Sequence, residues 1–199
     1  MIKIFVFSFV LIVLSGCMIT KSPVAQYQLS VEPLSEIDTS SGCKDKSLKV
    51  SQAFSSSSLM SLDMNYIEDK NKIYSYSQSQ WNDSVNQEVT SHILKVLRTS
   101  KLFKNTQNSK SRSRSDLILE INIIEFMQYF TDESKKSYVN IEISITLIDE
   151  KTAQVVATSS FSSKKKVDTL DASGGVIAFD EALRDILTQG VNFLNRICR

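Results

Sequence analysis

The chain has 199 residues, and its 23 Lys and Arg nearly balance its 22 Asp and Glu, so the formal net charge is only +1. This balance argues against a nucleic-acid-binding protein, which normally carries a basic footprint. The single histidine excludes a zinc site built from several histidines. The length suits one domain with a substantial core.

The first 16 residues are predicted to be a lipoprotein signal peptide. One lysine supplies the positive charge, and an apolar run of about 11 residues follows it from Ile4 to Leu14. That run is too short for a membrane-spanning helix, which needs about 20 residues. Ser15 and Gly16 are small enough for a peptidase site, and Cys17 follows them directly.

Residues 14–17, Leu-Ser-Gly-Cys, resemble the bacterial lipobox, in which the cysteine receives a diacylglycerol and the new amino terminus takes a further acyl chain such as palmitate. We therefore predict that Cys17 is acylated and attaches the mature protein to a membrane. The alternative is an ordinary secretory signal that happens to contain a cysteine. Met18 favours the outer membrane, because aspartate there favours inner-membrane retention. A lipid-anchored tether at 17–26 then leads to a single periplasmic domain at 27–199.

The domain is predicted to begin with short strands. Residues 27–31 form one candidate, and residues 47–54 form another because their apolar residues alternate. Residues 64–68 and 72–77 flank Asp69-Lys70-Asn71, which predicts two strands joined by a turn.

A helix is predicted from about Ser84 to Ser100, with Asn82 or Asp83 as its N-cap. Its apolar residues recur at the helical period, and they are Val85, Val89, Ile93, Val96 and Leu97.

Three strands are predicted next, at 117–126, 139–147 and 154–161. The first is apolar on both sides, as a central strand is, whereas the second alternates and has one wet face. A final amphipathic helix is predicted at 173–196. This order of elements predicts an α+β fold, in which two amphipathic helices pack on one face of a mostly antiparallel sheet.

Cys43 and Cys198 remain once Cys17 is acylated. An even pair of cysteines in an oxidising periplasm favours a disulfide, which would tie the two ends of the domain together. The alternative is two unpaired thiols.

The sequence offers little that catalysis could use, and we predict no enzyme, no metal site and no cofactor. His92, the one histidine, lies beside the apolar stripe of the first predicted helix, where a surface or rim position is expected. The sequence contains no Gly-x-Ser-x-Gly elbow, P-loop or dinucleotide cradle. Acidic pairs lie at turns or on a helix face, without the spacing of a calcium loop.

Two basic stretches, Lys110–Arg114 and Lys164–Lys166, are predicted to be solvated loops. A secreted location removes nucleic acid as a partner of the first. The second could meet anionic lipid headgroups.

Several short motifs of this sequence occur in the order that they have in a known protein family. The region around Trp81, preceded by Ile73-Tyr74 and Tyr76, carries the most weight. The other matching positions are Tyr27-Gln28-Leu29, Leu48-Lys49-Val50, Leu97 to Phe103, Leu117 to Phe126, Ile141 to Leu147, Ala178-Phe179 and Ala182-Leu183. With these motifs the chain resembles the ABC-type transport auxiliary lipoprotein family over roughly residues 24–195. It departs from the family at Ser55–Leu62, where a proline-containing turn is usual.

The resemblance implies a non-enzymatic envelope component. Such a protein helps an MCE-domain protein and its ABC permease and ATPase to move phospholipid or other hydrophobic molecules between membranes. Cys17 would fix the domain at a leaflet, and the domain would offer a docking surface, as one copy or as a homo-oligomer. Tyr74, Tyr76 and Trp81 are the candidates for partner contact, because Tyr and Trp are favoured interface anchors. The alternative is that they are ordinary core and edge packing.

Two other functions stay open. A lipoprotein that assists outer-membrane assembly, of the lipopolysaccharide-insertion type, could combine a similar domain with the same anchor. A lipid-anchored hydrolase would depend on His92 or on one specific serine.

Overall fold

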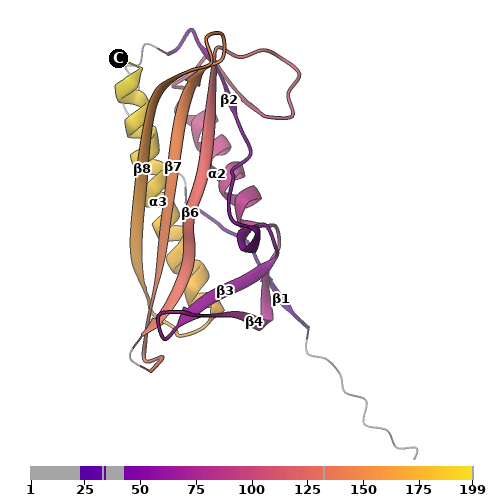
Figure 1. The fold of residues 1–199 in the computed structure, drawn as a ribbon, viewed down its shortest axis with the longest axis vertical. Coiled ribbons are helices and arrows are strands. Elements are labelled where there is room, and N and C mark those ends of the chain that lie inside the picture. The colour runs from indigo at the N-terminus through magenta and orange to yellow at the C-terminus, as the bar shows by residue number, and fades with distance from the viewer. Residues whose placement is uncertain (1–22, 33, 35–42, 132, 199) are drawn as a thin grey trace, which may run out of the picture.

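The structure, a computed structural model, describes residues 23–32, 34, 43–131 and 133–198. The predicted signal peptide, Cys17 and most of the tether lie outside these residues. In the described part, no helix is long and apolar enough to cross a membrane. This part forms a mixed eight-stranded sheet with two long helices on one face (Figure 1). The predicted α+β class is confirmed.

Three long antiparallel strands make up the centre of the sheet, and they are β6 (Leu117–Thr131), β7 (Lys136–Asp149) and β8 (Gln154–Val167). Buried and part-exposed residues alternate along β7, so one face meets the helices and the other meets solvent. The predicted meander is confirmed, but its last strand is longer than predicted. Lys164–Lys166 lies in β8 rather than in a loop, because its backbone pairs with residues 138–140 of β7.

Five further strands lie on the other side of β6. They are β1 (Ala25–Tyr27), β2 (Ser47–Val50), β3 (Asp63–Glu68), β4 (Lys72–Trp81) and β5 (Asn105–Asn108), and two of them, β2 and β3, pair with β6 directly. β2 runs parallel to the start of β6, with β5 on its outer side. β3 runs parallel to the end of β6 and is followed outward by β4 and β1. The sheet therefore forks along β6, with one arm at each end (Figure 1).

The chain between the two arms passes through a short 3-10 helix, η1 (Ser57–Leu59), where the sequence departs from the family pattern. Just before it, Phe54 makes a single bridge with Asn122 of β6. The predicted turn between β3 and β4 is confirmed, and Asp69 and Lys70 take left-handed conformations in it. β5 was not predicted, because its Asn-Thr-Gln-Asn sequence has no apolar alternation.

Both helices cover the same face of the sheet. α3 (Ala172–Ile197) packs along β7 and β8, and α2 (Val85–Ser100) packs against β5, β6 and α3. The prediction of Asn82 or Asp83 as N-cap is wrong, since Ser84 occupies that position. Asp171 caps α3 and accepts a hydrogen bond from the Gly174 N–H at 2.8 Å.

The core lies between the helices and the sheet. Its largest fully buried apolar side chains are Leu48, Val50, Met64, Val85, Leu102, Leu119, Ile141, Ile143, Leu147, Leu183 and Leu194. An apolar cavity of about 30 Å³ between α2, α3 and the sheet is lined by Ile93, Leu187 and Gly190, among others. That volume holds about one water-sized molecule, so this cavity cannot take a phospholipid acyl chain.

A disulfide joins Cys43 to Cys198, with the two Cα atoms 5.1 Å apart. Both residues are buried. The bridge fixes the end of α3 to the segment that leads into β2, and this is the pairing that the sequence predicts. Because 155 residues separate the two cysteines, the bridge restricts a large loop of the unfolded chain.

We expect Cys43→Ser combined with Cys198→Ser to lower the free energy of unfolding by about 2–4 kcal/mol. Thermal unfolding with and without a reductant checks this. Reductant should lower the Tm of the wild type and leave that of the double variant unchanged. If the reductant left the Tm of the wild type unchanged, that result would contradict the disulfide.

Close packing at the start of α3 requires glycine. A Cβ on Gly174 would overlap the backbone carbonyl of Thr169, which cannot move aside as the end of a flexible side chain could. A Cβ on Gly190 would instead meet only Ile145 Cδ1, at 3.9 Å.

We therefore expect Gly174→Ala to destabilise the domain by about 1–3 kcal/mol through overpacking. Gly190→Ala is the matched control, and we expect it to stabilise by up to about 1 kcal/mol because alanine favours the helix. Denaturant unfolding followed by Trp81 fluorescence measures both changes. Equal stabilities for Gly174→Ala and the wild type would show that Gly174 does not lie so close to Thr169.

Candidate functional site

Four aromatic side chains gather on the arm formed by β3 and β4 and on the end of β6. This aromatic cluster consists of Tyr66, Tyr74, Tyr76 and Phe130. The ring centroid of Tyr66 lies 4.8 Å from that of Tyr76, 5.6 Å from that of Tyr74 and 5.2 Å from that of Phe130. These separations are typical of favourable aromatic pairs, so Tyr66 holds the cluster together.

The three predicted docking residues occupy different environments. Tyr74 is 41% exposed, and its neighbour in sequence, Ile73, is 64% exposed. Tyr76 is half-buried in the aromatic cluster. Trp81 is only 3% exposed and packs edge-on against Phe126 and Phe179 in the core. The structure thus brings Tyr74 and Tyr76 together and places Trp81 apart from them.

A buried polar residue that the sequence prediction missed supports the aromatic cluster from behind. Gln128 is 1% exposed, and its Oε1 accepts a hydrogen bond from the Tyr76 hydroxyl at 3.1 Å. Its Nε2 donates to Ser137 Oγ at 3.0 Å and to the Asp171 carbonyl at 3.4 Å. Burial is the main cause that raises the pKa of Tyr76, so its hydroxyl stays protonated and able to donate.

Gln128 also explains why residue 175 is a glycine. A Cβ on Gly175, in the first turn of α3, would overlap the Gln128 amide, whose position is fixed by its three hydrogen bonds. The amide therefore links the β3–β4 arm, the central strands and the start of α3. The sequence signal for it is a glutamine in a strand whose other inward-facing residues are apolar.

The histidine holds the N-terminal segment against the helices. His92 Nε2 lies 3.2 Å from the Leu29 carbonyl, which can only accept, and 3.7 Å from Glu88 Oε2. The Ser30 N–H donates to Asp180 Oδ1 at 2.8 Å. Residues 29 and 30 therefore lie against both helices. The prediction of a strand at 27–31 is wrong for these residues, because β1 ends at Tyr27.

Burial has opposite effects on the two kinds of titratable group in this contact. It lowers the pKa of His92 and raises the pKa of Glu88 and Asp180. His92 is therefore neutral at neutral pH. Its contacts, a carbonyl and a carboxylate, include no nucleophile that a histidine base would activate. Across the described residues, no group of three or more His, Cys, Asp and Glu could hold a metal ion.

The open face of the sheet is hollowed where β6 forks. A hollow of about 400 Å³ lies there, lined by Gln52, Phe54, Asn122 and Thr146, among others. Phe54 at its border is 68% exposed. The hollow is wide and half polar, unlike the mostly apolar pockets that bury small molecules.

We expect Tyr76→Phe to lower the free energy of unfolding by about 1–3 kcal/mol, because it leaves the buried Gln128 Oε1 without its donor. Tyr74→Phe is the matched control and should change stability by less than about 0.5 kcal/mol, because Tyr74 is much more exposed. Denaturant unfolding measures both. Equal effects of the two variants would contradict the buried hydrogen bond.

Comparison with known proteins places this fold. The family model described as ABC-type transport auxiliary lipoprotein component matches residues 27–189. No curated protein matches. Among solved structures, protein XCC0632 from Xanthomonas campestris is similar, with a TM-score of 0.75 at 16% identity, over 88% of this chain and 96% of that one. An uncharacterised protein is similar with a TM-score of 0.66 at 13% identity, over 86% and 99% of the two chains.

At these identities the two solved structures show the fold alone. The family model carries more, because it spans more than half of the chain and includes α2, most of α3 and every strand from β2 to β8. This chain belongs to the ABC-type transport auxiliary lipoprotein family.

Proposed function

We propose that this protein is a membrane-anchored, non-enzymatic component of an ABC/MCE-type envelope transporter that moves phospholipid or other hydrophobic molecules between membranes. The family match over residues 27–189 carries the proposal. The partners would be an MCE-domain protein together with an ABC permease and ATPase. The protein would face the periplasm, with the outer membrane favoured over the inner.

Cys17 would be acylated after removal of residues 1–16. Ala25, the first residue of β1, lies eight positions after Cys17. A chain of eight residues reaches at most about 29 Å when fully extended. The anchor would therefore keep the domain at 27–199 within reach of its membrane, where it meets partners in two dimensions rather than three.

The domain would act by docking rather than by carrying lipid inside its core. The apolar cavity between its helices holds about 30 Å³, whereas pockets for small ligands measure about 300–1,000 Å³. We propose that the β3–β4 hairpin contacts the transporter through Tyr74 and Ile73, which expose the most apolar surface of that arm. Tyr76 and Trp81 would hold the hairpin in position, through Gln128 and the core respectively. Several copies could present this surface together.

Affinity purification from crosslinked envelopes tests the proposal. We expect the wild type to co-isolate an MCE-domain protein, a permease and an ATPase. Ile73→Ser combined with Tyr74→Ser should reduce this co-isolation at least several-fold, because hot-spot aromatics dominate such contacts. Phe54→Ser is the matched control, since it removes an exposed aromatic from the fork of the sheet and should leave co-isolation unchanged.

Two results would overturn the proposal in different ways. Co-isolation of a β-barrel assembly protein without any MCE subunit would favour the role in lipopolysaccharide insertion. An equal loss with both variants would show that the hairpin has no special part in docking, even if the partners are as proposed.

A further inference from the structure

One end of the molecule is strongly basic. Three segments, 44–49, 95–116 and 149–151, form this basic pole and together contain eleven Lys and Arg but only four Asp and Glu. Their net charge is +7, whereas the whole chain carries +1, so all other residues together carry −6. The balanced composition therefore hides a charge separation along the molecule.

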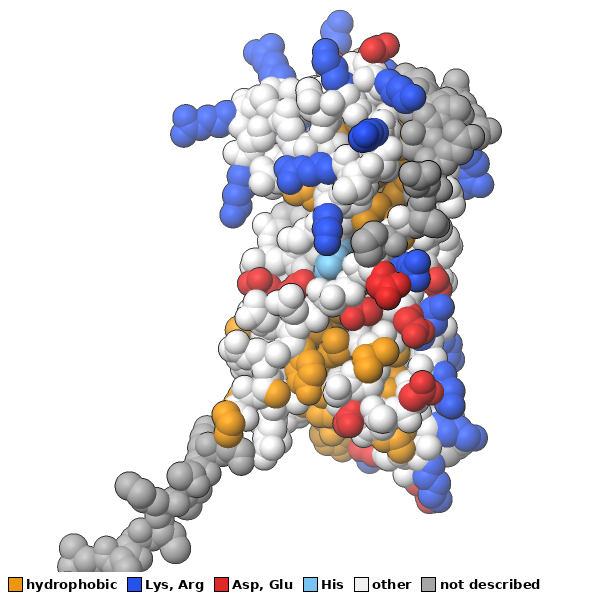
Figure 2. All heavy atoms as spheres, turned by 180° about the vertical axis from the view of Figure 1, so that it is seen from behind, with side chains coloured by type: hydrophobic (Ala, Val, Ile, Leu, Met, Phe, Trp, Pro, Cys, Tyr) orange, Lys and Arg blue, Asp and Glu red, His pale blue; other side chains and the backbone are white. Residues whose placement is uncertain are grey.

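The fold brings the three segments together. The Lys104 N–H donates to the Lys46 carbonyl at 2.9 Å, and the Glu150 N–H donates to the Asp116 carbonyl at 3.0 Å. These bonds join the end of α2, the start of β2 and the β7–β8 turn at one end of β6. Figure 2 shows many Lys and Arg side chains at this end and a second row along one edge, while Asp and Glu lie mainly in the middle and lower parts of this face.

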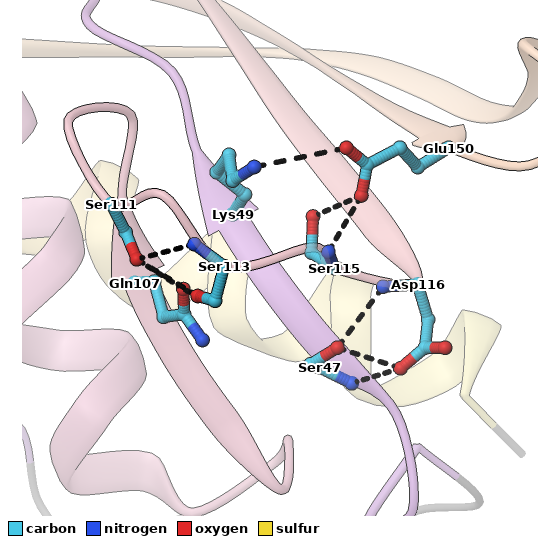
Figure 3. A network of polar contacts seen from close by, with 8 residues as sticks. All are labelled: Ser47, Lys49, Gln107, Ser111, Ser113, Ser115, Asp116 and Glu150. Atoms are coloured by element: carbon cyan, nitrogen blue, oxygen red, sulfur yellow. Dashed lines mark hydrogen bonds and ion pairs between the residues drawn. The ribbon is translucent and has the colours of Figure 1, made fainter.

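Three of the four acidic side chains at the pole are engaged with backbone and hydroxyl groups. Asp116 accepts hydrogen bonds from the Ser47 N–H and hydroxyl, each at 2.7 Å (Figure 3). Glu150 likewise accepts from the N–H and hydroxyl of Ser115, at 2.7 and 2.6 Å. Asp149 accepts from the Thr152 N–H at 2.9 Å, within its own turn. These bonds lower the pKa of all three carboxyls.

These acids thus hold the segments of the pole together, and the four acids offset only four of its eleven cations. Lys49 pairs with Glu150 at 3.7 Å and is half-buried, but the other ten cations are exposed. The loop that carries Lys110, Arg112 and Arg114 is held to β5 because the Ser111 and Ser113 hydroxyls both bond to the Gln107 side chain (Figure 3). The prediction of a loop at Lys110–Arg114 is confirmed, and hydrogen bonds hold this loop in place while its three cations are exposed.

The chemistry of the pole favours a lipid surface over a protein. Eight of its eleven cations are lysines, and every residue of the three segments is described. None of the large hydrophobic side chains exposed on the described surface lies in them. Protein interfaces are enriched in aromatics and arginine and depleted in lysine. Clustered lysines without apolar groups instead suit anionic bilayers, where each cation contributes attraction through water.

The pole lies away from the point where the tether joins the domain. The chain enters the domain through β1, which pairs with the end of β4 just before α2 begins. α2 then runs for 16 residues, about 24 Å, toward the pole (Figure 1). The pole thus lies beyond α2 from the point where the tether joins the domain.

We propose that the basic pole binds anionic phospholipid headgroups of an apposed bilayer, so that the anchored protein contacts two membranes. The two-membrane geometry rests on the proposed anchor at Cys17. The headgroup binding does not.

Vesicle capture tests this inference. The full-length protein is inserted into phosphatidylcholine vesicles, which carry no net charge, and these are mixed with fluorescent protein-free vesicles. We expect capture of vesicles that contain phosphatidylglycerol and not of pure phosphatidylcholine vesicles. Capture should weaken as salt rises from 0.1 to 1 M, because the Debye length falls from about 10 to 3 Å.

Two sets of four substitutions isolate the pole. The pole variant combines Lys104→Gln, Lys110→Gln, Arg112→Gln and Arg114→Gln. The control variant combines Lys70→Gln, Lys72→Gln, Lys135→Gln and Lys166→Gln at the opposite end of β6. Capture should fall at least about tenfold with the pole variant and stay near the wild-type level with the control. All eight side chains are exposed, so both variants should keep the wild-type Tm.

Three results would overturn the inference: equal capture by the pole variant, equal capture of pure phosphatidylcholine vesicles, or no capture by the wild type. The last would assign the pole to an acidic protein surface. Protein that stays in solution instead of inserting would show that the anchor proposal has failed. That soluble protein is then sedimented with the same phosphatidylglycerol vesicles, and the same two variants decide the question.

Discussion

Pairing along β6 is the constraint on which the rest of the structure depends. One edge of β6 is occupied by β7 over almost its full length, and the other edge is divided between β2 at its start and β3 at its end. Every short strand reaches the sheet through one of those two contacts. The fork therefore gives the molecule two different ends, one with the aromatic cluster and one with the basic pole.

The parts of the fold that follow from local sequence periodicity were predictable, and those that depend on distant pairing were not. Both helices and the β6–β8 meander have clear apolar repeats. β5 has none and exists because the edge of β2 is available to it. Of the aromatic candidates, sequence motifs identified Tyr74 and Tyr76 but could not show that Trp81 faces the core. The role of Gln128 could not be predicted from local sequence, because its hydrogen-bond partners are 9 to 52 residues away.

Two internal connections keep the ends of the molecule fixed relative to each other. At the aromatic end, the Gln128 amide joins β4, β7 and the start of α3. At the basic end, the Cys43–Cys198 bridge joins the finish of α3 to the entrance of β2. α3, a helix of 26 residues and about 39 Å, is thus held at both of its termini. The two connections therefore tie the two ends of the molecule to opposite ends of one helix.

Charge shows why composition alone was a poor guide to the surface. A net charge of +1 describes the field only at distances much larger than the molecule. At physiological ionic strength the Debye length is about 8 Å, which is shorter than α2, so a nearby surface responds to one end of the protein at a time. The end it meets carries +7 or belongs to the part that carries −6. Orientation, rather than total charge, therefore decides whether an anionic membrane attracts this protein or repels it.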